Sequence, residues 1–162
     1  MVEVRPMTME DVPAFHTTLD AVARERRYLR MLEAPLLEKL TDFIRKGLEN
    51  DAIHLVAADE SHIVGWCDIT PGSNGEAHVG YLGMGVHLNF RGQGIGQRLM
   101  ESAIAQARAI PLEKIELQVY TSNTPAVALY KKLSFVEEGL RQRARCVDGV
   151  YQDILLMALF LR

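Results

Sequence analysis

Six residues in the middle of the chain, Arg91-Gly92-Gln93-Gly94-Ile95-Gly96, have the composition and spacing of a loop that binds an anion. The three glycines leave backbone N–H groups uncovered and permit positive φ angles that other residues resist. Apolar residues then recur every three or four positions from Ile95 to Ala107, with polar residues such as Gln97 between them, which predicts an amphipathic helix. The unsatisfied donors and the dipole at the start of that helix favour negative charge. The sequence therefore predicts a phosphate-binding loop here.

Three phosphate-binding patterns can be compared with this loop. A P-loop requires Gly-Lys-Ser/Thr at the helix start, whereas this chain has Gly96-Gln97-Arg98. A dinucleotide fingerprint requires G-x-G-x-x-G after the first strand of a βαβ unit, but the spacing here is G-x-G-x-G and too few such units follow. The third pattern, Arg/Gln-x-x-Gly-x-Gly/Ala, holds the pyrophosphate of coenzyme A, and Arg91, Gly94 and Gly96 match it. On the loop alone, a glycine-rich turn that merely starts a helix stays the alternative.

Together with a second block of sequence, this loop resembles the GNAT superfamily of N-acetyltransferases. Residues 82–96 resemble the family's fourth strand and pyrophosphate loop, and residues 114–135 resemble its fifth strand and the helix after it. The second block fits the family pattern Asn-x-x-Ala-x-x-Leu-Tyr-x-x-x-Gly-Phe, except that Ser134 replaces the glycine; the matching residues are Asn123, Ala126, Leu129, Tyr130 and Phe135. The resemblance implies one α+β domain over residues 1–162, whose mixed, mostly antiparallel sheet is flanked by helices and splayed between its fourth and fifth strands.

The resemblance also implies roles for particular residues, with acetyl-CoA as co-substrate and no metal. The loop residues Arg91, Gly92, Gln93, Gly94, Ile95, Gly96 and Gln97 would bind the pyrophosphate. Backbone groups of Met84, Gly85 and Val86 would pair with the amides of the pantetheine arm as an edge strand pairs with a peptide, and Asn123 would form a further bond to this arm.

A backbone N–H in the fourth strand would stabilise the developing oxyanion, which is worth roughly 3 kcal/mol. Gly83 and Gly85 fit a close approach of the ligand, or else a bulge. Tyr130 would contact the cofactor and protonate the departing thiolate. The alternatives are a Tyr130 that only packs its helix on the sheet and an Asn123 that only forms a turn.

The general base is left open by the sequence. Some family members that acetylate protein N-termini place a glutamate where this chain has Gln118, and glutamine cannot take a proton. Glu116, His78 and Tyr81 are candidates on or near the central strands, acting directly or through a water. Each could equally be an ordinary exposed or packing residue.

By the same resemblance, two segments should line the acceptor side: residues 23–30 with the helix after them, and the hairpin 138–153. The motifs of this hairpin and of Met157-Ala158 resemble members acting on amino acids, ribosomal-protein N-termini or polyamines. Arg141, Arg143 and Arg145 alternate there and could face a carboxylate, or form a solvated strand face. A small amino acid or related primary amine is the leading acceptor, and a protein N-terminus is the second. A module that binds acetyl-CoA without turnover is the alternative outside the enzymes.

The composition of the chain limits which binding partners and which cellular compartment we expect. The net charge is −3 and 48% of the residues are hydrophobic, so no general basic field predicts nucleic-acid binding. Cys67 and Cys146 lack metal or redox spacing, which indicates reduced thiols in a cytosolic protein. The apolar run from Ile154 to Leu161 is too short to cross a bilayer, and the N-terminus lacks a signal-peptide pattern. We therefore expect a cytoplasmic protein without a membrane partner, and a homodimer is possible because relatives are often dimers.

The order of predicted elements is mixed. A strand over Val2–Arg5 precedes a helix that runs from Thr8 toward Met31, and Pro35 opens a second helix that ends near Gly47. Strands are further predicted over Ile53–Ala58, Ile63–Ile69, Val79–His87 and Lys114–Tyr120, and a last hairpin over Phe135–Arg145 and Tyr151–Phe160 that turns at Asp148-Gly149.

Overall fold

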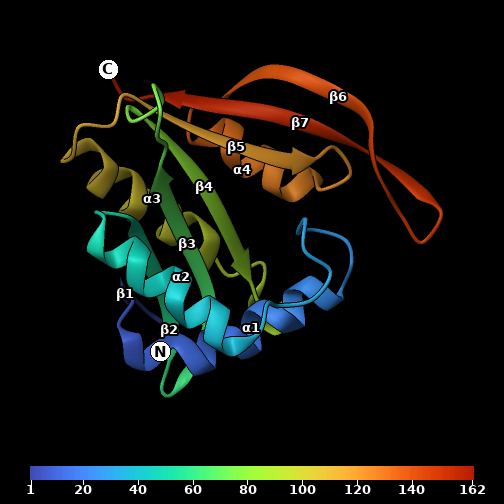
Figure 1. Ribbon diagram of the computed structural model, residues 1–162. Helices are drawn as coiled ribbons and strands as arrows, with labels where there is room; N and C mark the ends of the chain where they lie inside the picture. Colours follow the sequence, from blue (N-terminus) through green and yellow to red (C-terminus); the bar gives the residue numbers. More distant parts are fainter.

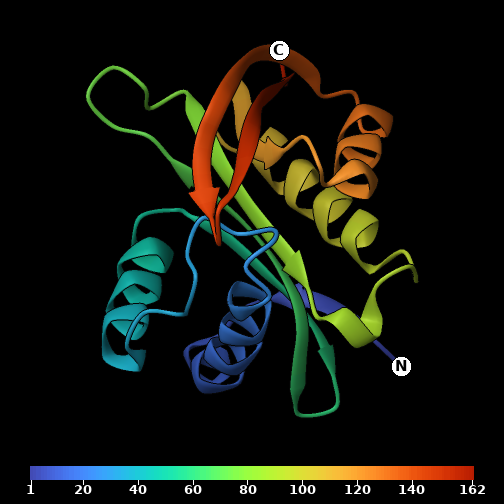
Figure 2. The ribbon, with the colours of Figure 1, turned by 90° about the vertical axis from the view of Figure 1, so that its right-hand side faces the viewer.

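The structure is a computed structural model of all 162 residues, and it contains one seven-stranded sheet with helices on both faces (Figures 1 and 2). The strands are β1 (Glu3–Pro6), β2 (Ile53–Asp59), β3 (His62–Pro71), β4 (Val79–Val86), β5 (Lys114–Tyr120), β6 (Val136–Val147) and β7 (Val150–Phe160). The α-helices are α1 (Val12–Arg24), α2 (Leu37–Glu49), α3 (Ile95–Arg108) and α4 (Thr124–Lys132), and the short 3-10 turns are η1 (Met9–Asp11) and η2 (Leu88–Phe90).

The strand order is β1-β2-β3-β4-β5-β7-β6, and every neighbouring pair is antiparallel except β4 and β5. These two parallel strands pair only where Val79–Tyr81 meets Lys114–Glu116. Beyond that point they diverge, as Figure 1 shows. The predicted α+β class, the mostly antiparallel sheet and the splay are confirmed.

The two faces of the sheet carry separate hydrophobic clusters. The larger cluster lies between the sheet and helices α3 and α4, and the smaller one lies under α1 and α2 (Figure 2). Because side chains alternate along a strand, Leu82, Met84 and Val86 of β4 pack into the larger cluster. Gly83 and Gly85 therefore present the other face of β4, toward α1 and α2.

Helix α1 is shorter than the sequence predicted. The apolar spacing favoured a helix toward Met31, but α1 ends at Arg24. Arg26 adopts a left-handed backbone with a φ of 59°, and its guanidinium makes two hydrogen bonds, of 2.8 and 3.0 Å, to the carboxylate of Asp148. A contact between residues far apart in sequence therefore accompanies the end of this helix, and no local signal could predict it.

Other boundaries differ by a few residues. Pro35 lies before the N-cap Leu36 of α2 rather than in its first turn, and α2 continues past Gly47 to Glu49. The final hairpin turns at Asp148-Gly149 as predicted, with φ angles of 53° and 77° that suit a type I′ turn. Cys67 is buried and Cys146 is exposed, and neither forms a disulfide. No helix has the length and apolar character needed to cross a membrane.

Candidate active site

A cavity of about 950 Å³ lies at the splay between β4 and β5. It passes from the α3–α4 side of the sheet to the α1–α2 side, since residues of both sides line it. The predicted cofactor-binding residues on its wall are Met84, Gly85, Val86, Arg91, Gly92, Gly94, Ile95, Gly96, Gln97, Asn123 and Tyr130. Gln93 is the one predicted residue that does not line it. The structure therefore gathers two distant blocks of sequence around one space.

The glycine-rich loop presents a row of free backbone donors at one end of this cavity. The N–H groups of residues 92–97 donate no hydrogen bond within the chain. Gly92 and Gly94 have φ angles of 75° and 78°, and open space surrounds the position of a Cβ at either residue. Donors of this kind at the start of α3 form an anion site. The loop therefore fits the pyrophosphate of acetyl-CoA.

The side chain of Arg91, unlike the backbone N–H groups after it, is bonded within the chain. Its Nε donates to the carbonyl oxygen of Val86 at 2.8 Å, and its Nη1 donates to the carboxylate of Glu25 at 2.9 Å. Its guanidinium also lies 4.7 Å from the centre of the Tyr28 ring. The guanidinium thus joins the loop to the end of α1, and sequence reasoning missed this contact because Glu25 carries no motif.

The glycines of β4 make room for protein side chains. A Cβ on Gly85 would lie 2.3 Å from the Trp66 ring, and a Cβ on Gly83 would lie 3.3 Å from the Asp68 carboxylate. The pairing of β3 with β4 is regular here, so neither glycine marks a bulge. Side chains of β3 therefore favour glycine at positions 83 and 85, in addition to the close approach of a ligand that the sequence predicted.

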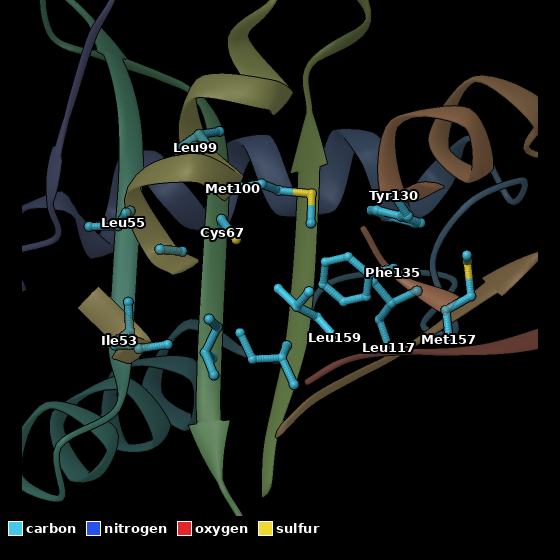
Figure 3. Packing of buried hydrophobic residues seen from close by; sticks show 14 of the residues in the cluster. Ile53, Leu55, Cys67, Leu99, Met100, Leu117, Tyr130, Phe135, Met157 and Leu159 are labelled. Carbon is cyan, nitrogen blue, oxygen red and sulfur yellow. The ribbon is translucent and has the colours of Figure 1, made fainter. Parts of the chain in front are cut away.

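Tyr130 lies on α4 beside the cavity and is only 6% exposed. Figure 3 shows it near Phe135 and Met157, across β4 from Cys67. Burial raises the pKa of the Tyr130 phenol well above its usual range, so the proton stays on oxygen at neutral pH. No protein group bonds to its hydroxyl. Tyr130 therefore packs its helix beside the cavity, and its role as a proton donor stays a prediction.

Asn123 both caps α4 and lines the cavity. Its side-chain oxygen accepts a bond of 3.4 Å from the N–H of Ala126 and so caps α4. It also lines the cavity, and its amide nitrogen donates to no protein group. Binding of the pantetheine arm by this nitrogen stays a prediction.

Of the three candidate bases, two already form an ion pair or a hydrogen bond within the chain, and the third does not line the cavity. Glu116 lines the cavity but pairs with Lys114 at 2.7 Å, and Lys114 also holds Glu138 at 2.9 Å. The Tyr81 hydroxyl donates to Glu76 at 2.8 Å, a bond that raises the pKa of Tyr81. His78 does not line the cavity, whereas Gln118 does.

The far side of the cavity is enclosed by the segment after α1 and by the β6–β7 hairpin. Tyr28, Leu29 and Arg30 come from the first, and Glu138, Leu156 and Met157 from the second. Figure 2 shows the hairpin tip beside this segment, and the Arg26–Asp148 pair joins them. The guanidinium of Arg145 further donates to the carbonyl of Arg30 at 2.8 Å. The predicted acceptor segments therefore meet.

The arginine row of β6 does not face the cavity. The register shifts between Arg141 and Arg145, which breaks the expected alternation. Arg143 stacks on the ring of Tyr151 at 4.0 Å. None of these three arginines lines the cavity. The cation at the rim is instead Arg30, which has no carboxylate partner. No group of three or more His, Cys, Asp or Glu side chains is placed to hold a metal ion.

Comparison with known proteins agrees with this geometry. The sequence profile of the Acetyltransferase (GNAT) family matches residues 17–135. A Bacillus subtilis protein named a putative ribosomal protein bS18-alanine N-acetyltransferase is 30% identical over 116 residues, 71% of this chain and 74% of that protein. An L-amino acid N-acetyltransferase of Escherichia coli is 30% identical over 123 residues, 75% of this chain and 72% of that protein.

Among solved structures, a GNAT superfamily phosphinothricin acetyltransferase from Sinorhizobium meliloti in complex with acetyl-CoA has the same fold. Its TM-score is 0.91 at 16% identity, over 98% of this chain and 88% of that one.

Proposed function

This chain belongs to the GNAT family of acetyltransferases and is an acetyl-CoA-dependent N-acetyltransferase, and we propose that its acceptor is the primary amine of a small amino acid. The observation that carries this proposal is the enclosure of the acceptor side. Two segments, joined by the Arg26–Asp148 pair and by the bond from Arg145 to the Arg30 carbonyl, meet over it. A small acceptor fits such a space better than an extended polypeptide.

Arg30 supports an acceptor that carries a carboxylate. Arg30 lines the cavity, is exposed and has no carboxylate partner within the chain. A guanidinium binds a carboxylate through two parallel hydrogen bonds. Glu116 and Glu138 line the same cavity, and the pair shares the single cation Lys114, so one net negative charge is left there that would favour the ammonium end of an amino acid.

The catalytic part of the proposal assigns one role to each group already described. The free N–H groups of residues 92–97 hold the pyrophosphate, and the unpaired edge of β4 beyond Tyr81 holds the pantetheine arm. Tyr130 gives its proton to the leaving sulfur. Its raised pKa makes this transfer harder in isolation, but a thiolate in the same buried cavity is also destabilised, so the two effects partly cancel.

A panel of acceptors tests the proposal. Release of free thiol from acetyl-CoA would be measured with amino acids, the corresponding amino acid amides, polyamines and an alanine-initiated peptide. We expect the free amino acids to give the highest kcat/KM. A higher kcat/KM with the peptide would favour a protein N-terminus, the acceptor named for one relative. A cytoplasmic location and a homodimer stay predictions.

Arg30→Met sharpens the test. The change keeps an unbranched, flexible stem and removes the charged guanidinium, so KM for the amino acid should rise about tenfold, the usual worth of a charged hydrogen bond. KM for the amide should not change, because the amide has no carboxylate to lose. The matched control is Arg27→Met, since Arg27 stacks on the Tyr28 ring at 5.7 Å but does not line the cavity. Equal effects of Arg30→Met on acid and amide would contradict the assignment.

A further inference from the structure

Asp68 is a carboxylate of β3 that none of the contacts described above explains. It is partly buried, and no donor or cation of the chain bonds to it. A partly buried carboxylate without a partner is costly, because burial removes part of the water that stabilises its charge. Such a group is therefore a candidate for function.

Its place relative to β4 connects it with the active site. Asp68 is paired in register with Gly83, and its Oδ2 lies 3.3 Å from where a Gly83 Cβ would stand. The carboxylate thus occupies the space that a side chain of β4 would fill, on the α1–α2 face where the acceptor segments lie. Residues 84–86, which would hold the reacting end of the pantetheine arm, are one to three positions further along, roughly 3–10 Å at the rise of a strand.

A second, smaller hollow lies on the other side of Asp68. Its volume is about 240 Å³. The lining is mainly apolar, with Phe43, Ile44 and Leu48 of α2 and Ile53 of β2, and its polar members are Lys46, Asn50, His54, Asp68 and Thr70. Gly83 lines the large cavity, and Asp68 lines this hollow. The carboxylate therefore stands between Gly83 of the reaction space and a partly open hollow.

From this placement we propose that Asp68 accepts the proton that the acceptor ammonium must lose, directly or through one water, and passes it to solvent through the smaller hollow. The proposal rests on the acetyl transfer described under Proposed function. The ammonium gives one proton to Asp68, and the free nitrogen pair then attacks the thioester carbonyl carbon. As the C–N bond forms and the C–S bond breaks, a second nitrogen proton replaces the proton that Tyr130 gives to sulfur. The products are the amide, the free thiol and one proton released from Asp68.

The surroundings of Asp68 suit this role near neutral pH. Burial raises the pKa of its carboxyl to about 7, whereas burial lowers the pKa of the facing His54 to about 4, so the imidazole adds no charge. The other titratable groups nearby are Lys46 on α2, Tyr81 on β4 and Cys67 beside it on β3. A base with a pKa near the working pH combines a usable unprotonated fraction with real affinity for the proton.

Asp68→Asn tests the proposal, because it keeps the shape of the side chain and removes the proton acceptor. With whichever primary amine the wild-type protein acetylates best, kcat at pH 7 should fall by roughly 10²-fold or more. Coenzyme A affinity should not change, and thermal stability should not fall, because a neutral amide is cheaper to bury than an unpartnered carboxylate. The control Asp42→Asn makes the same change of charge on the exposed face of α2, where Asp42 pairs with Arg45.

The pH profile separates a base from a structural residue. Wild-type kcat/KM should rise with pH and level off above about 7, since the base must be unprotonated. In Asp68→Asn the levelling-off near pH 7 should disappear, and kcat/KM should instead keep rising with pH as the fraction of free amine increases. An acceptor of low amine pKa, which arrives unprotonated, should recover most of the lost rate.

Two outcomes would overturn the role of Asp68: an Asp68→Asn variant with the wild-type pH profile, or an equal loss of rate for protonated and unprotonated amines. Because the assay uses the best acceptor found, small or peptide, an error in the acceptor class would show in the panel and leave this result unaffected. Gly83→Ala is a second variant, whose added Cβ at 3.3 Å should displace the carboxylate and give a smaller loss.

Discussion

The two ends of the cavity are built in opposite ways. At the loop of residues 92–97 the chain offers backbone N–H groups, and few side chains take part. At the acceptor end it offers side chains, notably Arg30, Glu116 and Glu138, from three separate segments. A backbone cradle needs only glycines at the right spacing, so it is local in sequence. A side-chain pocket needs long-range assembly, and its specificity can change without altering the cradle.

The Arg91 side chain joins these two ends. It bonds to Val86 and Glu25 and stacks on Tyr28, which itself lines the cavity. The largest effects should nevertheless come from groups that act where the ends meet, and the smaller ones from groups that serve a single end or neither.

The largest expected effect is that of Tyr130→Phe, which removes the proposed proton donor between the two ends. We expect kcat to fall roughly 10²–10⁴-fold, the usual range for one acid–base group. Kcat/KM should fall in parallel, because the interaction is made mainly in the transition state. Coenzyme A affinity and thermal stability should stay near those of the wild type, because the ring keeps its packing against Phe135.

Tyr120→Phe is the matched control for that variant. Tyr120 is also buried, and its hydroxyl likewise has no partner, but it does not line the cavity. Its loss of a hydroxyl should leave turnover unchanged. A Tyr130→Phe enzyme that turns over within a few-fold of the wild type would remove Tyr130 from the mechanism.

Gly94→Val should weaken cofactor binding at the loop end of the cavity and leave the acceptor end unaffected. Its side chain would enter the open space beside the N–H groups, at a φ of 78° that a β-branched residue resists. Calorimetry should show coenzyme A affinity reduced by an order of magnitude or more, whereas the KM of the acceptor at saturating acetyl-CoA should change little.

Gly75→Val imposes the same backbone strain at a φ of 97° in a loop that does not line the cavity, and it should leave both quantities unchanged. Undiminished affinity in a folded Gly94→Val variant would place the phosphate site elsewhere. A large rise in acceptor KM would break the contrast between the two ends.

The same contrast explains what could be read from the sequence. Gly94, Asn123 and Tyr130 lie within short patterns, so the loop could be predicted from its glycines and the splay from the family resemblance that these patterns carry. Asp68 could not, because its significance depends on Gly83 of a neighbouring strand and on the absence of a partner. The end of α1 also could not, since Arg26 is held by Asp148. The glycine at position 83 did indicate that something lies close to the backbone of this strand, but the sequence favoured a ligand rather than the carboxylate of Asp68.

The smallest effect concerns Ser134, the residue that replaces the glycine of the family pattern. The N–H of Phe135 donates to the carbonyl of Tyr130 and that of Ser134 to Lys131, each at 3.0 Å, which is a Schellman motif at the end of α4. The motif needs a left-handed residue at position 134, and Ser134 has a φ of 74°.

Ser134→Gly should therefore relieve backbone strain worth about 1 kcal/mol, partly offset by the greater freedom of glycine in the unfolded chain. The melting temperature should rise by up to about 2–4 °C, the shift expected for that energy in a chain of this size. Turnover should be unchanged, because the serine already holds Tyr130 in place. Ser134→Val, which resists the left-handed backbone, should instead lower the melting temperature and reduce kcat by moving Tyr130. If both variants shifted stability equally without changing kcat, the Schellman turn would support only the fold and not the position of the phenol.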